Sequence, residues 1–323
     1  MTKATILGTG SYRPERIVTN FDLEKIVETN DEWIQSRTGI ETRHVSTGEN
    51  TSDLAYEAAI KALESSKLSP EELDLIIVAT ITPDHFMPST ACLLQKRLGA
   101  KNATAFDLSA ACSGLVFGID VGTQFIESGR HKHILVVGSE VMSKAVNWQD
   151  RNTCVLFGDG AGAVILGPSK NDRGIKAIYT GSDGDVENYL ALTARPVDNF
   201  LNKEEEKKHY LTMDGQEIFK FAVRIMRKGL KEVVSRAGKT LDDVSYIVPH
   251  QANSRIIDLV ATKMKFSSDK FYLNLKNVGN TSSASIGLAL DELMHSGKLE
   301  HGQDIVLMGF GGGLTWGVIY IEY

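Results

Sequence analysis

The sequence has few cysteines, and the three that it has follow no pairing pattern. Cys92, Cys112 and Cys154 form an odd set with irregular spacing, which argues against a disulfide framework and favours a reducing cytoplasm. They do not combine with histidines at the spacings typical of zinc ligands. The cysteines therefore predict neither a disulfide-rich secreted domain nor a structural metal site.

The chain also lacks long apolar runs and an excess of positive charge. It has no stretch of about 18 apolar residues to span a membrane, and its N-terminus lacks the apolar segment of a signal peptide. The formal net charge of −6 argues against nucleic-acid binding. Gly8 and Gly10 lack the third glycine and the following acid of a dinucleotide site, which argues against an NAD-dependent oxidoreductase. We expect a cytoplasmic protein without membrane or nucleic-acid partners.

Apolar, β-rich runs alternate with longer helical patterns, which is typical of a layered α/β fold. Strands are expected at 4–7, 75–80, 134–138, 163–166, 175–179, 246–249, 305–309 and 317–321. Helices are expected at 51–63, 89–97, 114–128, 216–237, 254–263 and 283–296.

The two halves of the sequence resemble each other weakly, which indicates an internal duplication. The acidic turn and strand at 69–79 recur at 240–250, and the strand at 134–138 recurs at 305–309. Both pairs of segments lie 171 positions apart. Because two separate strands give the same offset, we predict two pseudo-symmetric α/β halves.

The duplication also predicts where the reactive residues meet. A third match, between Glu127 and His295, gives an offset of 168 and sets Cys112 opposite Asn280, each in the turn before its helix. The offset of 171 sets His250 at the end of a strand. Ligand sites in such sheets lie at strand and helix ends, so one pocket is expected there.

Cys112 stands among small residues just before an expected helix. The unpaired N–H groups and the positive dipole end of a helix N-terminus favour the thiolate, which is the reactive form. Small neighbours would let a substrate carbonyl approach the sulfur. Without further context a free cysteine is more often a buried structural residue, an interpretation that we keep for Cys92 and Cys154.

Three other segments have candidate chemical roles beside a structural alternative. His250 follows a strand ended by Pro249, where its ring could transfer a proton or simply bond to backbone. Asn280 could donate from its amide to a substrate oxygen, or cap a helix. The glycine-rich segment 309–317 could expose a backbone N–H that forms an oxyanion hole with the N–H of Cys112, or be only a turn between strands.

These motifs, in this order, resemble the β-ketoacyl-acyl-carrier-protein synthase III family of the thiolase superfamily, over essentially the whole chain. The segments that carry the resemblance are 31–43, 110–114, 157–162, 249–253, 279–282 and 311–317. The resemblance implies a homodimer with a thiolase-like fold, in which two α/β halves form five layers in the order αβαβα. The half with the nucleophilic cysteine would span 1–172, and the half with histidine and asparagine would span 173–323.

The resemblance also implies roles for single residues. The catalytic triad falls on Cys112, His250 and Asn280, and the oxyanion hole on the N–H groups of Cys112 and Gly312. The residues expected to grip coenzyme A are Trp33, Arg37 and Arg151. Those expected to contact acyl carrier protein (ACP) are Arg255, Lys220 and Lys263. The family often has phenylalanine where this chain has Met87, a position from which the partner subunit lines the acyl pocket, so the acyl chain length stays open.

The implied activity is a decarboxylative Claisen condensation of acyl-CoA, with acetyl-CoA as the expected primer, and malonyl-ACP. It starts fatty acid biosynthesis and needs no cofactor, because the coenzyme A thioester is a substrate. An acyltransferase of a secondary-metabolite pathway is the alternative, since its motifs would look the same. A thiolase is disfavoured because 309–313 has no second cysteine, an elongating synthase because Asn280 is not histidine, and an inactive scaffold because the triad is intact.

Overall fold

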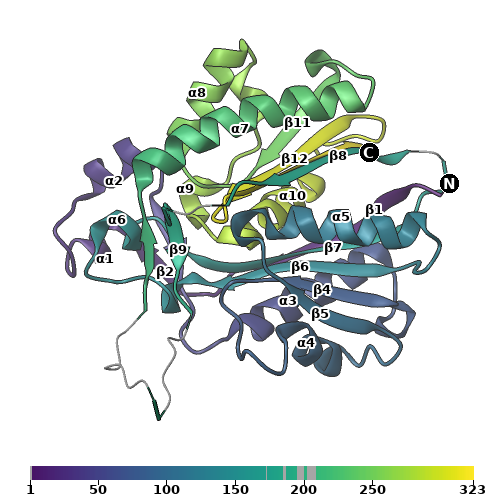
Figure 1. Cartoon of the computed structure of the whole chain (residues 1–323), viewed down its shortest axis with the longest axis horizontal. Helices are drawn as coiled ribbons and strands as arrows, with labels where there is room; N and C mark the ends of the chain where they lie inside the picture. The colour runs from purple at the N-terminus through teal and green to yellow at the C-terminus, as the bar shows by residue number, and fades with distance from the viewer. Residues whose placement is uncertain (1, 172, 185–186, 195–199, 202–208) are drawn as a thin grey trace.

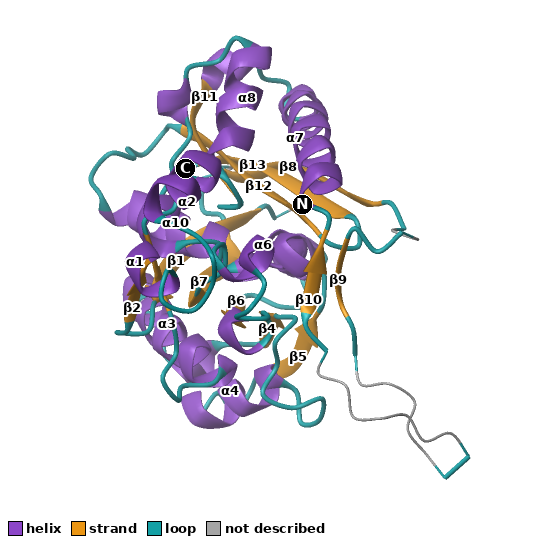
Figure 2. Cartoon of the chain, turned by 90° about the vertical axis from the view of Figure 1, so that its left-hand side faces the viewer, coloured by secondary structure: helices purple, strands orange, loops and turns teal. Residues whose placement is uncertain are grey.

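The computed structural model describes residues 2–171, 173–184, 187–194, 200–201 and 209–323. Its helices and sheets alternate in five layers, with two sheets that each lie between helices (Figure 1). Figure 2 shows the same succession of layers from the side. The arrangement is the predicted αβαβα fold. Within these residues, no helix combines the length and the apolar character that crossing a bilayer requires.

The N-terminal sheet has five strands in the order β1–β7–β6–β4–β5. Their bounds, in that order, are Ala4–Tyr12, Asp159–Pro168, Ile134–Val141, Leu75–Ala79 and Thr104–Leu108. Strand β4 pairs in parallel with β5 and β6, and β7 pairs antiparallel with β6 and β1. Every residue of β4 and β6 is buried, because helices cover both faces of the sheet.

The C-terminal sheet repeats this pairing in the order β11–β12–β13–β8. Its strands span Val244–Pro249, Asp304–Gly311, Thr315–Glu322 and Gly174–Ser182. The pair β11–β12 is parallel and the other two pairs are antiparallel, as at the corresponding places of the first sheet. The chain passes from one sheet to the other between Pro168 and Gly174. The predicted division between 172 and 173 falls in this link and stays a prediction, since residue 172 lies outside the described part.

Six long helices form the three helical layers. Helices α3 (Thr51–Ser66) and α4 (Thr90–Leu98) cover the first sheet, and α7 (Gly215–Arg236) and α8 (Ser254–Met264) cover the second. Helices α5 (Gly114–Glu127) and α10 (Ser285–His295) lie between the sheets. The eight predicted strands and six predicted helices are all confirmed, whereas β5 was not predicted.

The helix starts differ between the layers. Side chains cap the outer helices, as Asn50 does for α3 and Asp214 for α7. The central helices α5 and α10 begin without a side-chain cap, each after a 3₁₀ turn: η2 (Ala111–Ser113) before α5 and η6 (Ser282–Ala284) before α10. The two uncapped starts lie near each other, since η2 packs against η6.

The central layer joins the two halves closely. Helix α10 belongs to the second half in sequence but packs on β7 and β1 of the first. At the closest approach, a Cβ added to Gly162 would lie 2.5 Å from the Cα and carbonyl carbon of Gly287. Only glycine leaves room for this contact between a strand and a helix backbone.

The duplication is confirmed, but the predicted alignment of Cys112 with Asn280 is wrong. The two 3₁₀ turns share an unusual backbone, with φ of 45° at Ala111 and 50° at Ser282, 171 positions apart. The counterpart of Cys112 is therefore Ser283. The offset of 168 fails because α10 has 11 residues and α5 has 14, so a match at the helix ends does not extend back to their starts.

Short elements complete the fold around the site. They are β2 (Ile17–Thr19), β3 (Thr42–His44), β9 (Leu190–Leu192), β10 (Leu211–Met213), α1 (Asn20–Leu23), α2 (Asp31–Thr38), α6 (Arg151–Cys154), α9 (Leu275–Val278) and the 3₁₀ turns η1 (Pro70–Glu72), η3 (Met142–Lys144), η4 (Leu241–Asp243) and η5 (Ser268–Lys270). Cys154 is buried, as predicted. Cys92 is exposed on the outer face of α4, so its predicted burial is wrong.

Candidate active site

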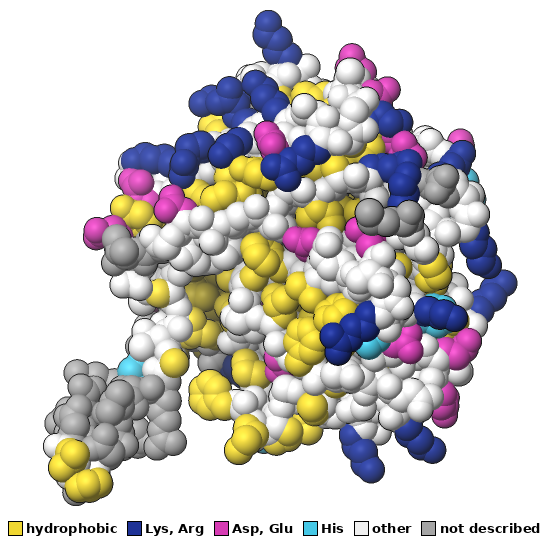
Figure 3. Space-filling view, turned by 45° about the vertical axis from the view of Figure 1, so that its right-hand side comes forward, with side chains coloured by type: hydrophobic (Ala, Val, Ile, Leu, Met, Phe, Trp, Pro, Cys, Tyr) yellow, Lys and Arg dark blue, Asp and Glu magenta, His cyan; other side chains and the backbone are white. Residues whose placement is uncertain are grey.

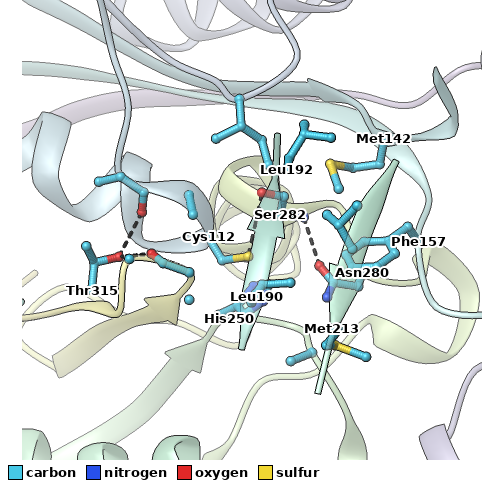
Figure 4. Close-up of a pocket in the computed structure, with 18 of the residues that line it drawn as sticks. Cys112, Met142, Phe157, Leu190, Leu192, Met213, His250, Asn280, Ser282 and Thr315 are labelled. Carbon is cyan, nitrogen blue, oxygen red and sulfur yellow. Dashed lines mark hydrogen bonds between the residues drawn. The ribbon is translucent and has the colours of Figure 1, made fainter. Parts of the chain in front are cut away.

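A cavity of about 620 Å³ is lined by residues of both halves, and the three predicted triad residues all lie on its wall (Figure 4). Cys112 comes from the turn before α5, His250 from the end of β11, and Asn280 from the segment before η6. Gly312 also lines the cavity. The fold thus brings Cys112 together with two residues that lie more than a hundred positions later in the sequence.

Cys112 is held in η2 behind Ala111, whose positive φ turns the chain sharply before the helix. The side chain is almost completely buried, and its thiol donates a hydrogen bond to the Ser282 hydroxyl at 3.6 Å. A Cβ at Gly311 would lie 2.9 Å from the Cβ and N of Cys112. The glycine at the end of β12 therefore lets the second half contact Cys112 directly.

The structure corrects the predicted charge of Cys112. The pKa of its thiol is raised to about 12, chiefly by burial and to a smaller extent by the nearby carboxyl of Glu140, while the hydrogen bond with Ser282 acts in the opposite direction. In the resting enzyme the sulfur is therefore a thiol, because burial outweighs the effect of the helix start. An attack by Cys112 needs a group that removes the proton.

His250 stands at the corner between β11 and α8, as predicted. Its backbone N–H donates to the Met308 carbonyl at 2.7 Å, while its ring Nδ1 lies 2.6 Å from the Ser285 Oγ. Burial lowers the pKa of the ring to about 3, so the imidazole is neutral. The alternative of a histidine bonded only to backbone is wrong.

The hydroxyl of Ser285 sets which nitrogen of His250 carries the proton. Its single hydrogen can go to the Ser282 carbonyl at 2.9 Å or to His250 Nδ1. In the first case Nδ1 carries the ring proton and Nε2 is an acceptor. In the second case Nε2 carries the proton and can donate. Each orientation of this hydroxyl thus goes with one tautomer of the imidazole, in which Nε2 is an acceptor or a donor.

Asn280 is oriented as a donor. Its Oδ1 accepts from the Ser282 N–H at 2.9 Å, so the amide NH₂ is the group left for a ligand. Its own N–H donates to the Leu156 carbonyl at 2.9 Å, and its carbonyl accepts from Gly158 N–H at 3.0 Å. Asn280 caps no α-helix, because α10 begins after Ala284. These contacts fix the carboxamide at the cavity wall.

The sequence did not reveal a buried acid close to the nucleophile. Glu140 stands near the end of β6 with no exposed surface, and the Ser282 and Ser283 hydroxyls lie 3.1 and 2.9 Å from its Oε1. The available signal was an acid within an otherwise apolar run, 134–141. Burial raises the pKa of its carboxyl, against the hydrogen bonds that lower it.

The predicted coenzyme A residues form a cluster on α2 and α6. The guanidinium carbons of Arg37 and Arg151 lie 4.9 and 5.0 Å from the ring centroid of Trp33. Arg151 also donates to the Glu28 carbonyl at 3.0 Å. The indole and two guanidiniums offer stacking faces for a flat aromatic ring, but none of the three lines the cavity itself.

The predicted ACP residues lie on the outer face of α7 and α8. Lys220 and Lys263 line a surface groove, together with Phe219, Val223, Arg224, Arg227, Lys228, Lys231 and Leu259. Arg255 stands 5.9 Å from the ring of Phe219, which also lines the active cavity. The basic groove therefore adjoins the cavity.

Met87 does not line the cavity of its own chain. Its side chain is 88% exposed, and its neighbour Phe86, which does line the cavity, is 84% exposed. The role of Met87 in the acyl pocket of a partner subunit stays a prediction.

The five-layered fold and its cavity of cysteine, histidine and asparagine define a condensing enzyme of the thiolase superfamily. The family model for 3-oxoacyl-[acyl-carrier-protein] synthase III matches residues 106–184, and the model for its C-terminal part matches 234–323. The β-ketoacyl-[acyl-carrier-protein] synthase III of Clostridium kluyveri is 53% identical over 322 residues, covering 100% of this chain and 99% of that protein. The chain therefore belongs to the 3-oxoacyl-ACP synthase III family.

Other relatives agree with this assignment. The β-ketoacyl-[acyl-carrier-protein] synthase III of Clostridium acetobutylicum is 52% identical over 324 residues, covering 100% of this chain and 99% of that protein. The crystal structure of 3-oxoacyl-[acyl-carrier-protein] synthase III from Aquifex aeolicus superposes with a TM-score of 0.93 at 47% identity, covering 99% and 100% of the two chains. The priming β-ketosynthase of the R1128 polyketide pathway gives a TM-score of 0.94 at 35% identity, covering 99% and 96%.

Proposed function

We propose that the protein condenses acyl-CoA with malonyl-ACP to give 3-oxoacyl-ACP and so starts fatty acid biosynthesis, with acetyl-CoA as its primer. The observation that carries this proposal is the single cavity on which Cys112, His250 and Asn280 meet within the family's fold. The chemistry uses only groups of the chain and its two thioester substrates.

In the first half-reaction, the sulfur of Cys112 attacks the thioester carbonyl of acyl-CoA. The N–H groups of Cys112 and Gly312 bind the oxyanion that forms, and coenzyme A leaves as its thiolate. Trp33 and Arg151 stack on the adenine ring, and Arg37 adds positive charge for the phosphates. Gly311 supports this step, because a Cβ at its position would lie 3.2 Å from the sulfur.

In the second half-reaction, malonyl-ACP enters and loses CO₂. The resulting enolate oxygen accepts hydrogen bonds from the Asn280 amide and from Nε2 of His250, in the state where Ser285 donates to Nδ1. The enolate carbon then attacks the acyl-cysteine. Donors that are already in place where charge develops lower the barrier, and removal of one typically costs about 100- to 1,000-fold in rate.

The basic groove of α7 and α8 is the proposed docking surface for ACP, through Lys220, Arg255 and Lys263. Figure 3 shows Lys and Arg side chains gathered over the upper part of the molecule, where these helices lie. ACP is acidic, so a local positive surface on a chain of net charge −6 favours its approach. The groove leads to the cavity through the shared residue Phe219.

We also propose a cytoplasmic homodimer. The exposed side chains of Phe86 and Met87 at the cavity edge support it, because large apolar groups on a surface are often covered by a partner. In the dimer, the partner subunit would extend the wall of the acyl pocket.

Priming of a secondary-metabolite pathway is the second candidate function. The similarity to the R1128 priming β-ketosynthase over 99% of this chain supports it. A competition among acetyl-, isobutyryl- and longer acyl-CoA with malonyl-ACP tests the two, since the main proposal expects acetyl-CoA to be the preferred primer.

The test of the main proposal is mass spectrometry of the protein after incubation with acetyl-CoA. We expect one acetyl group on Cys112, and none on the Cys112→Ser variant. In Asn280→Ala, malonyl-ACP decarboxylation should fall by about 100-fold or more while acetylation of Cys112 is kept. Acetylation elsewhere in an active enzyme, or a larger loss of acetylation than of decarboxylation in Asn280→Ala, contradicts the assigned roles.

A further inference from the structure

Glu140 is a fully buried carboxyl group that the condensation mechanism above does not use. It stands in β6, which β4 separates from β5, the strand that precedes η2. Its side chain has no exposed surface. An isolated buried carboxylate is costly unless donors satisfy it. The arrangement of those donors therefore indicates the role of the Glu140 carboxyl group.

The segment after β4 supplies three donors to one side of the carboxylate. The Thr82 hydroxyl lies 2.6 Å from Oε2, the Thr80 hydroxyl 3.1 Å, and the Ile81 N–H 3.1 Å. Both hydroxyl oxygens already accept a backbone N–H, Thr82 from Val141 and Thr80 from Thr82 itself, each at 3.0 Å. Their hydrogens are therefore directed to Glu140, which fits the ionised form.

The other oxygen of Glu140 is connected to the nucleophile. Ser282 donates to Oε1 at 3.1 Å, and its oxygen accepts the thiol hydrogen of Cys112 at 3.6 Å. Ser283 lies 2.9 Å from the same Oε1. A continuous chain of hydrogen bonds thus runs from the sulfur through one hydroxyl to a carboxylate, with each hydrogen pointing toward the acid.

We propose that Glu140 stores the proton of Cys112 between the two half-reactions, with the Ser282 hydroxyl as the relay. The proposal rests on Cys112 being the nucleophile of the proposed function. It assigns the removal of the thiol proton to Glu140, and leaves His250 as a hydrogen-bond donor to the enolate.

The proton and charge balance is complete in both steps. As sulfur attacks, the S–H bond breaks, Ser282 Oγ gains that hydrogen and passes its own to Oε1, and coenzyme A leaves as a thiolate that takes a proton from water. When the condensation releases the sulfur as a thiolate, the O–H bond at Oε1 breaks and the hydrogen returns through Ser282. Glu140 ends as a carboxylate and Cys112 as a thiol.

The stored proton also changes the charge of the site between acylation and the reaction of malonyl-ACP. The resting site holds one negative charge, on Glu140. After acylation Glu140 is neutral, so its charge no longer opposes the malonyl carboxylate or the enolate that forms from it. A shift of charge from one buried group to another costs less than a second buried charge.

Few other ionisable groups face Glu140 in the described structure. Strand β4 and turn η6 carry none, and β7 contributes Asp159. Lys144 follows β6 and interacts electrostatically with both Glu140 and Asp159. On the helices packed against β6, Asp53 pairs with Arg97 and Asp120 accepts from Thr180. On α10, Asp291 accepts from Thr9 and Ser11, and Glu292 pairs with Arg13.

The test is the rate at which iodoacetamide alkylates Cys112, measured by peptide mass spectrometry from pH 5 to 10. The reaction needs no thioester, so it reports on proton removal even if the proposed condensation is wrong. The variants are Glu140→Gln, which keeps the shape but cannot take a proton, Ser282→Ala, and His250→Gln. Alanine suits the Ser282 backbone, because Ala111 has nearly the same φ in the equivalent turn.

In the wild type we expect the rate to rise as Glu140 ionises and then to level off. Burial raises the pKa of this carboxyl, so the rise lies above the range of an exposed glutamate. In Glu140→Gln and Ser282→Ala the plateau should vanish, and the rate should follow hydroxide up to the alkaline titration of the thiol. The loss near pH 7 should be about 100-fold, as for removal of a general base.

The double variant Glu140→Gln/Ser282→Ala should be no slower than either single variant, because the two groups act as one relay. A plateau kept in Glu140→Gln but lost in His250→Gln makes His250 the base and overturns the proposal. So does a double variant whose losses multiply. Exposed Cys92, alkylated in the same samples, controls for reagent and pH, and circular dichroism controls for folding.

Discussion

At the residue scale, the sulfur of Cys112, the proposed nucleophile, lies in surroundings that disfavour its charge. Water cannot stabilise a thiolate there, and the turn that places it also brings Gly311 and Ser282 into direct contact. Reactivity must therefore come from neighbours that accept a proton and from backbone groups that receive the oxyanion. Small changes at these contacts should have large effects.

Gly311→Ala tests the contact between β12 and the nucleophile. The added methyl would lie 2.9 Å from the Cβ and 3.2 Å from the sulfur of Cys112, so one of the two must move. We expect a loss of about 1–3 kcal/mol in the free energy of unfolding from overpacking, and a loss of acetyl transfer to Cys112. Urea unfolding and mass spectrometry measure the two effects.

Gly297→Ala is the matched control for that substitution, because it tests a glycine with open space around its Cβ position. It sits at φ 71° after α10, so it should cost stability but leave acetyl transfer unchanged. Full acetyl transfer in Gly311→Ala would show that the strand does not confine the sulfur.

The sequence predicted correctly that Cys112, His250 and Asn280 share one pocket, and their catalytic roles stay a prediction. It did not reveal the residues that contact them. Cys112, His250 and Asn280 stand in short motifs whose residue types already indicate chemistry. Glu140 acts through contacts with Ser282 and Thr82, 142 and 58 positions away, which no local pattern reveals. The charge state of Cys112 was predicted wrongly for the same reason, since the depth of its burial depends on both halves.

At the element scale, the outer helices α7 and α8 carry charged side chains on the surface, whereas the central helices α5 and α10 begin beside the cavity. The apolar face of α7 packs on the second sheet, and its basic residues line the groove. Alternation and helical periodicity predicted these elements well. Strand β5 escaped prediction because it is a sheet edge of five residues without a fully buried position.

Arg255→Glu tests the proposed docking surface. Reversing this charge should lower kcat/KM for malonyl-ACP roughly tenfold at low salt and weaken its salt dependence, because rim charges act mainly on the association rate. Acetyl transfer from acetyl-CoA to Cys112 should not change. Steady-state kinetics at two ionic strengths measure the first effect, and single-turnover acetylation the second.

Lys96→Glu gives the matched control, since Lys96 is exposed on α4, in the opposite outer layer. It changes the net charge by the same amount at a distant surface. An equal loss in both variants would mean that net charge, and not the groove, governs the encounter with ACP.

At the scale of the whole molecule, the duplication explains why the site lies where it does. Two similar halves bring their 3₁₀ turns together between the sheets. Cys112 comes from the turn of the first half, whereas His250 and Asn280 both come from the second half. The sequence predicted this arrangement from two strand offsets of 171. It misaligned the turns, because helix lengths differ between the halves and only the structure shows that difference.

Burial of a neutral imidazole makes the stability of the whole fold depend on pH. The folded pKa of His250 is about 3, below the unfolded value of 6.5, so the unfolded state binds the extra proton as pH falls through 6.5. The contribution of this residue to the free energy of unfolding should therefore be fully present above pH 6.5. Below that pH it should fall, by about 2 kcal/mol at pH 5.

The measurement is urea unfolding of wild type and His250→Gln at pH 7.5 and pH 5. The variant keeps a polar side chain but has no imidazole to take up a proton on unfolding. Its loss of unfolding free energy between these pH values should therefore be smaller than that of the wild type by about 2 kcal/mol. Equal losses would mean that the imidazole is charged in the folded protein.

The contact between Gly162 and Gly287 has a consequence for how substrates reach the sulfur. A helix backbone seated on a strand backbone cannot swing away without breaking the central layer, so the halves do not hinge apart. The two proposed thioester substrates must therefore reach Cys112 through the opening of a cavity whose walls do not part, and one must leave before the other enters.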